Sequence, residues 1–170
     1  MSSIGDASYL NPVLAQDSAS SDINSFVFNG LIKYNRNLDG FVGELAESWK
    51  IEEGPEPVIT FFLRKGVLWH DGKKFTAEDV KFTYEKLMDP KTNTVRRSDY
   101  ELVKKAEVLD PYTFRVIYKQ PFSPGMGTWG MGVLQNIFWK RRISTPLPSI
   151  ADPSGQALFD SWSGWAMRRS

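Results

Sequence analysis

The residue types that could do chemistry are one histidine beside an aspartate, and a scatter of carboxylates. His70 is the only histidine of the chain, and Asp71 follows it directly. A histidine–carboxylate pair can transfer protons, and histidine also binds metal ions. No serine or cysteine motif accompanies the pair, however, and Asp71-Gly72 is typical of a tight turn. We therefore predict a strand end and a turn here, with no catalytic residue and no metal ligand.

A group of glutamates could also suggest acid–base catalysis. Its members lie within thirteen residues of one another: Glu44, Glu47, Glu52, Glu53 and Glu56. Their spacing fits the solvated surface of a hairpin better than a catalytic pair. Aromatic residues make up 14% of the chain, but they lie in or beside predicted elements and no basic stripe alternates with them. The sequence therefore predicts neither an enzyme nor a nucleic-acid-binding protein.

Composition is that of a soluble globular domain. The chain has 170 residues, of which 41% are hydrophobic and 24% charged, with a formal net charge of +1. The lack of cysteine excludes disulfides, thiolate metal sites and cysteine nucleophiles. No apolar run approaches the ~20 residues that span a bilayer. The first residues do not form a secretory signal, so an exported protein would have lost its signal before this numbering begins.

Two hairpins are the main predicted β structure. Residues 48–64 contain one of them, preceded by a helical turn that starts at Glu44, and residues 102–119 contain the other. Apolar and polar residues alternate from residue 112 to 119, which predicts a strand with one buried face. Phe61 and Phe62 point to opposite faces of their strand, so either both faces are covered or one phenylalanine is exposed.

Two helices should lie beside these hairpins. Ser21 or Asp22 could cap the first helix, which we expect to end near Gly30. Thr76-Ala-Glu-Asp79 matches a capping box and begins the second, which ends at Asp89-Pro90.

The character of the sequence changes near Lys140. The net charge turns from slightly negative to positive, prolines interrupt the chain, and no hydrophobic period continues. We divide the chain into residues 1–139 and an irregular tail of residues 140–170. Our hypothesis is that the tail is degenerate or out-of-frame sequence and that the chain is an N-terminal fragment.

Five blocks carry a family resemblance, and they occur in the family's order. They are Gly5-Asp-Ala-Ser-Tyr-Leu-Asn-Pro12, Asn29–Tyr34, Glu44-Leu-Ala-Glu-Ser-Trp49, Leu63-Arg-Lys-Gly-Val-Leu-Trp-His-Asp-Gly72 with its continuation to Val80, and Lys105–Pro121. Together they resemble the extracytoplasmic solute-binding proteins of family 5, which bind dipeptides, oligopeptides or nickel. The chain departs from the family at residues 53–61, and also after Trp139, where two expected family motifs do not appear.

The resemblance implies a mixed α/β fold, part of the periplasmic-binding-protein type II architecture, with the N-terminal lobe and an adjoining subdomain. It also implies a function outside the cytoplasmic membrane. The chain would be a monomeric component of an ABC importer that captures a peptide or related small solute for the permease subunits, without a cofactor. The alternative is a truncated, non-functional remnant with no competent ligand cleft.

By the same resemblance, two segments face the ligand. The first holds Gln16, Asp17 and Ser18, in a loop that could equally be ordinary surface. The second is the glycine-rich stretch of residues 122–132, where Trp129 and Met131 could touch an apolar group and glycines permit close backbone approach. The alternative for this second segment is a loop that crosses between domains.

Overall fold

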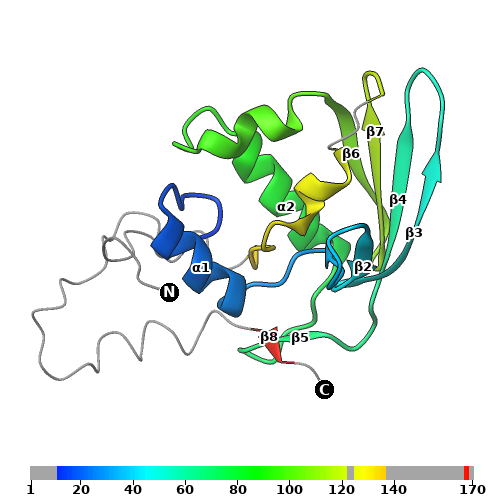
Figure 1. Ribbon diagram of the computed structural model, residues 1–170. Helices are drawn as coiled ribbons and strands as arrows, with labels where there is room; N and C mark the ends of the chain where they lie inside the picture. Colours follow the sequence, from blue (N-terminus) through cyan, green and yellow to red (C-terminus); the bar gives the residue numbers. More distant parts are fainter. Residues whose placement is uncertain (1–10, 122–124, 137–166, 169–170) are drawn as a thin grey trace, which may run out of the picture.

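A four-stranded antiparallel sheet lies along one side of the molecule. The computed structural model describes residues 11–121, 125–136 and 167–168. The sheet contains β3 (Ala46–Glu52), β4 (Val58–Leu63), β6 (Val103–Asp110) and β7 (Thr113–Tyr118), in the order β3-β4-β7-β6 (Figure 1). The two predicted hairpins are thereby confirmed, and β4 joins them by pairing with β7.

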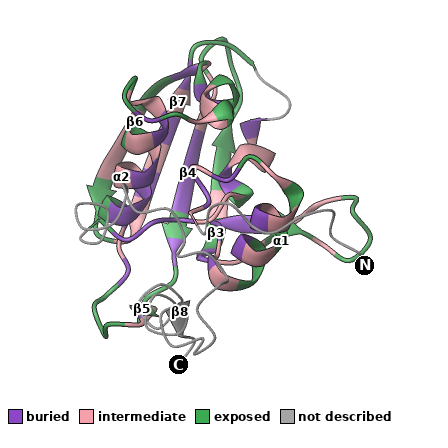
Figure 2. Cartoon of the chain, turned by 90° about the vertical axis from the view of Figure 1, so that its left-hand side faces the viewer, coloured by how far each residue is buried: buried purple, intermediate pink, exposed green. Residues whose placement is uncertain are grey.

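One face of the sheet is covered and the other is largely solvated. Phe114, Val116 and Tyr118 are buried on β7, which confirms the predicted alternation. On β4, Phe61 is fully buried whereas Phe62 is 38% exposed. Of the two alternatives for this pair, the correct one is therefore that one phenylalanine is exposed. Figure 2 shows the buried residues that run along β4. The core therefore lies on the side of the sheet that carries Phe61.

Helix α2 (Ala77–Met88) packs against this covered side of the sheet. The predicted capping box is present: the backbone N–H of Thr76 donates to the Asp79 carboxylate at 3.1 Å. Val80 and Leu87 lie on one buried stripe of the helix. The helix ends at Met88, immediately before the predicted stop at Asp89-Pro90.

Two predicted boundaries are wrong. Helix α1 spans Ser18–Val27 and is capped by Asp17, one turn before the predicted cap, because the Asp17 carboxylate accepts the backbone N–H of Ser20 at 2.7 Å. The helical turn expected from Glu44 is replaced by strand, since β3 already begins at Ala46. There the backbone pairs with Leu63, and this pairing with a neighbouring strand outweighs the local helical preference.

Shorter elements complete the fold. They are β1 (Ile32–Tyr34), β2 (Phe41–Gly43), β5 (Leu68–Trp69), β8 (Met167–Arg168) and the 3-10 helices η1 (Val95–Tyr100) and η3 (Gly127–Gly130). β1 pairs with β2, and β5 pairs with β8. Apart from β8, the predicted irregular tail lies outside the described residues, as does most of the first resemblance block.

The segment Asp71–Thr83 is tied to residues 134–136. The Asp71-Gly72 turn is confirmed, with φ of +79° at Gly72, and both carboxylate oxygens of Asp71 accept the side-chain amide of Gln135 at 3.1 Å. The Asp79 carboxylate accepts the backbone N–H of Asn136 at 3.1 Å and the indole N–H of Trp69 at 3.2 Å. These contacts hold the start of α2 against a segment more than fifty residues later in the chain.

Candidate functional site

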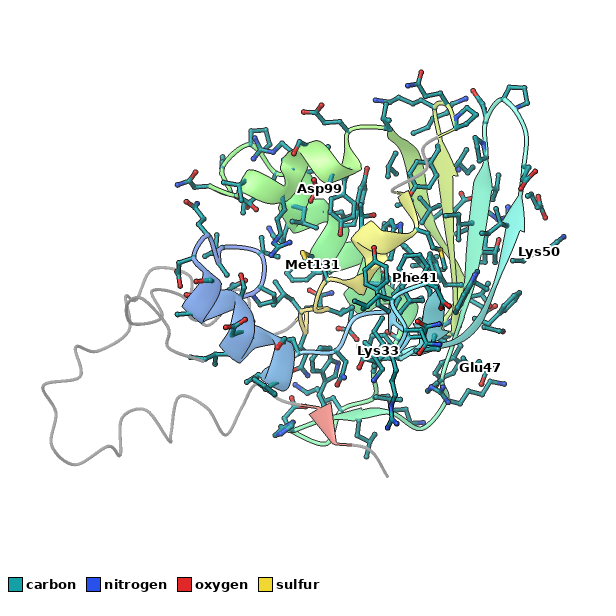
Figure 3. All side chains as sticks on the ribbon, viewed as in Figure 1. Lys33, Phe41, Glu47, Lys50, Asp99 and Met131 are labelled. Atoms are coloured by element: carbon teal, nitrogen blue, oxygen red, sulfur yellow. The ribbon has the colours of Figure 1, made fainter. Side chains whose placement is uncertain are left out.

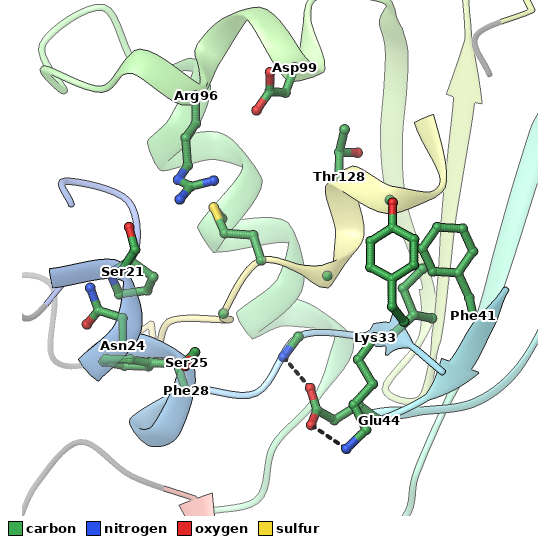
Figure 4. A pocket seen from close by; sticks show the side chains of 18 of the residues that line it. Ser21, Asn24, Ser25, Phe28, Lys33, Phe41, Glu44, Arg96, Asp99 and Thr128 are labelled. Carbon is green, nitrogen blue, oxygen red and sulfur yellow. Dashed lines mark hydrogen bonds and ion pairs between the residues drawn. The ribbon is translucent and has the colours of Figure 1, made fainter. Parts of the chain in front are cut away.

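A hollow of about 910 Å³ opens between α1, the β1–β2 hairpin, η1 and η3 (Figure 4). Residues from all four elements line it, and they come from three separate stretches of the sequence, residues 12–44, 96–100 and 127–132. Its size is within the range of sites that bind small molecules, about 300–1,000 Å³. It is therefore the candidate ligand site among the described residues.

Helix α1 forms one wall of the hollow. Ser21, Asn24, Ser25 and Phe28 line it, which places hydroxyl and amide groups beside one aromatic side chain. The Asp17 cap fixes where this helix begins. Since α1 turns every 3.6 residues, residues 21, 24 and 25 lie on the same face, and Phe28 directly follows the end of the helix.

A close backbone contact between Gly30 and Gly130 forms the base of the hollow. A Cβ atom added at Gly30 would lie 2.3 Å from the Gly130 carbonyl oxygen, which is closer than Cβ atoms approach other atoms in real structures. Only glycine therefore fits at this position. The backbone N–H of Leu31 donates to the carbonyl of Trp129 at 2.9 Å, and Val133 donates to Asn29 at 2.9 Å. The glycine-rich segment thus approaches another part of the same chain, which is the contact that its glycines permit.

Aromatic and charged groups of the β1–β2 hairpin form the opposite wall. The rings of Tyr34 and Phe41 lie 4.7 Å apart. The Glu44 carboxylate accepts the backbone N–H of Gly30 at 3.0 Å and the ammonium group of Lys33 at 3.3 Å (Figure 4). Lys33 and Glu44 therefore neutralise each other at this wall. Of the glutamates considered for acid–base chemistry, Glu44 lines the hollow, and the other four are exposed on β3 and its hairpin tip.

Two tyrosine hydroxyls hold η3 and the residues just before it in place. The Tyr100 hydroxyl donates to the carbonyl of Thr128 at 2.6 Å, and the Tyr118 hydroxyl donates to the carbonyl of Gly125 at 2.9 Å. Burial, followed by the charge of Asp99, raises the pKa of Tyr100 well above its ordinary value of 10.0. This hydroxyl therefore remains a donor at any physiological pH.

Replacing Tyr100 with phenylalanine is expected to lower the free energy of unfolding by about 1 kcal/mol, because the Thr128 carbonyl loses its buried donor. Urea denaturation of the two proteins measures the difference. Tyr34→Phe is the matched control, since the Tyr34 hydroxyl makes no hydrogen bond to the part of the chain that the structure describes, and its loss should change little. Equal effects of the two substitutions would contradict this role of Tyr100.

The residues predicted to face ligand are placed in different surroundings. Met131 is half-buried and lines the hollow (Figure 3). Trp129 is 5% exposed and lies outside the lining, in ring contact with Phe61, Tyr100 and Phe114. Gln16 and Ser18 are exposed at the start of α1, and Asp17 caps that helix.

Other lining residues were not singled out from the sequence. Examples are Asn24, Arg96 and Thr128, which line the hollow. In the sequence, residues 91–98 are typical of a polar loop. The helical face that carries Asn24 has no pattern that distinguishes a ligand contact from ordinary surface.

Within residues 11–121 and 125–136, no group of three or more histidine, cysteine, aspartate or glutamate side chains could hold a metal ion. Nor does any helix in these ranges have the length and apolar character needed to cross a membrane.

The fold of the chain matches solved periplasmic binding proteins. NikZ from Campylobacter jejuni, in complex with Ni(L-His), gives a TM-score of 0.72 at 31% identity, over 82% of this chain and 28% of NikZ. AppA from Bacillus subtilis, in complex with a nonapeptide, gives a TM-score of 0.73 at 30% identity, over 84% of this chain and 28% of AppA. The fold is therefore part of the mixed α/β architecture of periplasmic binding proteins, as the sequence predicts.

Sequence comparison gives the family. Residues 40–159 match the bacterial extracellular solute-binding proteins, family 5 Middle, and the chain belongs to this family. It is 34% identical over 123 residues to the oligopeptide-binding protein AppA of Bacillus subtilis, covering 72% of this chain and 22% of AppA. It is 31% identical over 114 residues to the glutathione-binding protein GsiB of Escherichia coli K12, covering 67% of this chain and 22% of GsiB. The chain thus spans about a fifth of the length of these relatives.

Proposed function

We propose that this chain is part of the substrate-binding component of an ABC importer and binds a peptide or a related small solute in the hollow beside α1. The component would act outside the cytoplasmic membrane and deliver its solute to permease subunits, without making or breaking a bond. The relatives are named for the binding of oligopeptides and glutathione, and NikZ was solved with Ni(L-His). The observation that carries the proposal is the hollow itself, with polar side chains and aromatic groups on facing walls.

Within this proposal, the candidate residues have different tasks. Met131 contacts the ligand from η3, and Trp129 acts indirectly by holding η3 against the core. Asp17 fixes the start of α1. A ligand longer than the hollow would extend past the N-terminus of α1, where Gln16 and Ser18 are exposed.

A thermal-unfolding scan with and without a pool of di- to hexapeptides tests the proposal. A ligand that binds only the folded state raises the free energy of unfolding by roughly 1.4 kcal/mol when its free concentration is ten times Kd. For a chain of this size that corresponds to about 3–5 °C in Tm. A rise of this size supports binding, whereas an unchanged midpoint favours the alternative, a truncated remnant with no competent cleft.

Two variants of α1 locate the binding. Ser25→Trp places a large side chain into the hollow and should abolish the shift in Tm, since Ser25 lines it (Figure 4). Phe26→Trp is the matched control, because Phe26 is 89% exposed on the same helix and lies outside the lining. Loss of the shift in both variants, or in neither, would place any binding elsewhere.

A further inference from the structure

A strained and exposed leucine forms the tip of the β1–β2 hairpin. Leu38 has φ of +60°, and it is the one non-glycine residue with a positive φ in the described part of the chain. Left-handed backbone brings the Cβ atom close to the following carbonyl oxygen, which costs free energy at a leucine. The side chain is 73% exposed, so burial in the core does not offset this cost. Strain that the surrounding structure holds in place is typical of functional sites.

Asn35 holds the tip in this conformation. Its side-chain oxygen accepts the backbone N–H groups of Asn37 at 3.1 Å and of Asp39 at 3.2 Å, and its side-chain amide donates to the Asp39 carboxylate at 2.6 Å. The backbone N–H of Asn35 donates to the carbonyl of Gly40 at 2.9 Å, and that of Leu38 donates to the carbonyl of Asn35 at 3.2 Å. The tip is therefore a closed turn that keeps Leu38 in the lining of the hollow.

Two aromatic rings continue the apolar surface from the tip into the hollow. Tyr34 is 57% exposed, its ring lies 4.7 Å from that of Phe41, and both residues line the hollow together with Leu38. A Cβ atom added at Gly127 would lie 3.4 Å from the Tyr34 hydroxyl oxygen and 3.5 Å from a ring carbon of Phe41, so both rings reach the backbone of η3. Figure 4 shows Phe41 across the hollow from the polar wall of α1. We call Tyr34, Leu38 and Phe41 the aromatic shelf.

The charged groups beside the aromatic shelf already have partners. Lys33 and Glu44 pair at 3.3 Å, and the Asp39 carboxylate accepts the side-chain amide of Asn35. A ligand group that contacts the shelf therefore needs no charge, and the contact removes apolar surface from water. An aromatic group gains more than an aliphatic one, since ring pairs are stabilised beyond the area that they bury.

We propose that the aromatic shelf binds an aromatic side chain of the peptide, so that the site prefers peptides with an aromatic residue. This inference rests on the proposed function, which it deepens by naming the side chain that the site selects. It also accounts for the residue at the tip. Glycine or asparagine would fit the turn with less strain than Leu38, but neither would supply an apolar contact.

Titration calorimetry on the 170-residue chain tests the preference with alanine-based tripeptides that carry one phenylalanine, leucine or serine at each position in turn. We expect phenylalanine at one position to strengthen binding about 10-fold over serine, and by a smaller factor over leucine. Leu38→Asn and Tyr34→Ala should each reduce this preference, whereas Tyr34→Phe should keep it because the ring remains. Leu38→Asn should not lower Tm, because asparagine tolerates left-handed backbone.

Leu109→Asn is the matched control, since Leu109 is 45% exposed and lies outside the lining of the hollow, and it should leave the preference intact. Tripeptides that bind with no preference for phenylalanine at any position overturn the role of the shelf and leave the proposed function standing. So does a preference that survives in both Leu38→Asn and Tyr34→Ala, or a Tm that falls in Leu38→Asn. Failure of every tripeptide to bind overturns the proposed function and this inference with it.

Discussion

Replacing Trp129 with alanine is expected to lower the free energy of unfolding by about 3–5 kcal/mol, the usual cost of truncating a buried aromatic side chain. The indole lies in ring contact with Phe61, Tyr84, Tyr100 and Phe114, with centroid separations of 5.3–6.3 Å. Its N–H donates to the Tyr118 hydroxyl at 2.9 Å. The substitution thus opens a cavity where sheet, α2 and η3 meet. Urea denaturation measures the loss.

Two further variants separate packing from ligand contact. Trp129→Phe keeps an aromatic ring and should cost about 1–2 kcal/mol, mainly through the lost hydrogen bond and the smaller volume. Met131→Ala lies on the hollow side of the same segment, so we expect it to weaken peptide binding with a smaller loss of stability. A stable Trp129→Ala protein that loses only ligand affinity would show that Trp129 contacts ligand directly.

Replacing Asp79 with alanine is expected to lower the free energy of unfolding by about 3 kcal/mol, roughly 1 kcal/mol for each donor left without an acceptor. Asp79 is 6% exposed, and its carboxylate accepts N–H groups from Trp69, Thr76 and Asn136. One side chain thus joins the end of β5, the start of α2 and the segment after Val133. Glu78→Ala is the control, because Glu78 is exposed in the same first turn. Similar losses in the two variants would argue against this role.

The stability that Asp79 contributes should also depend on pH. Burial raises the pKa of Asp79 above its ordinary 3.8, although the three N–H donors act in the opposite direction. A carboxyl group whose pKa is higher in the folded state stabilises the fold most below its unfolded pKa, and this contribution is lost as pH rises through the folded value. The advantage of the wild type over Asp79→Asn should therefore shrink as pH rises from 3.8 through the raised pKa. An advantage that grows with pH would contradict this sign.

The sequence alone determined the local elements and the family. Hairpins, the capping box at Thr76 and the turn at Gly72 depend on side chains a few residues apart, so their patterns are visible in the sequence. The five ordered motif blocks were likewise sufficient to predict the family that the comparisons confirm. The predicted start of α1 was wrong because Ser21, Asp22 and Asp17 are all good caps, and the choice depends on which residues the rest of the fold buries.

Only the tertiary structure decided which residues meet at the hollow. Asn24, Arg96 and Met131 come from three separate segments, and no local pattern indicates that they share one space. The same holds for the difference between Arg96 and Arg97: the sequence shows two equivalent neighbours, and the fold gives backbone acceptors to Arg97 and places Arg96 at the hollow. The physical reason is that burial and hydrogen-bond satisfaction depend on contacts between distant segments, which form only when the whole core packs.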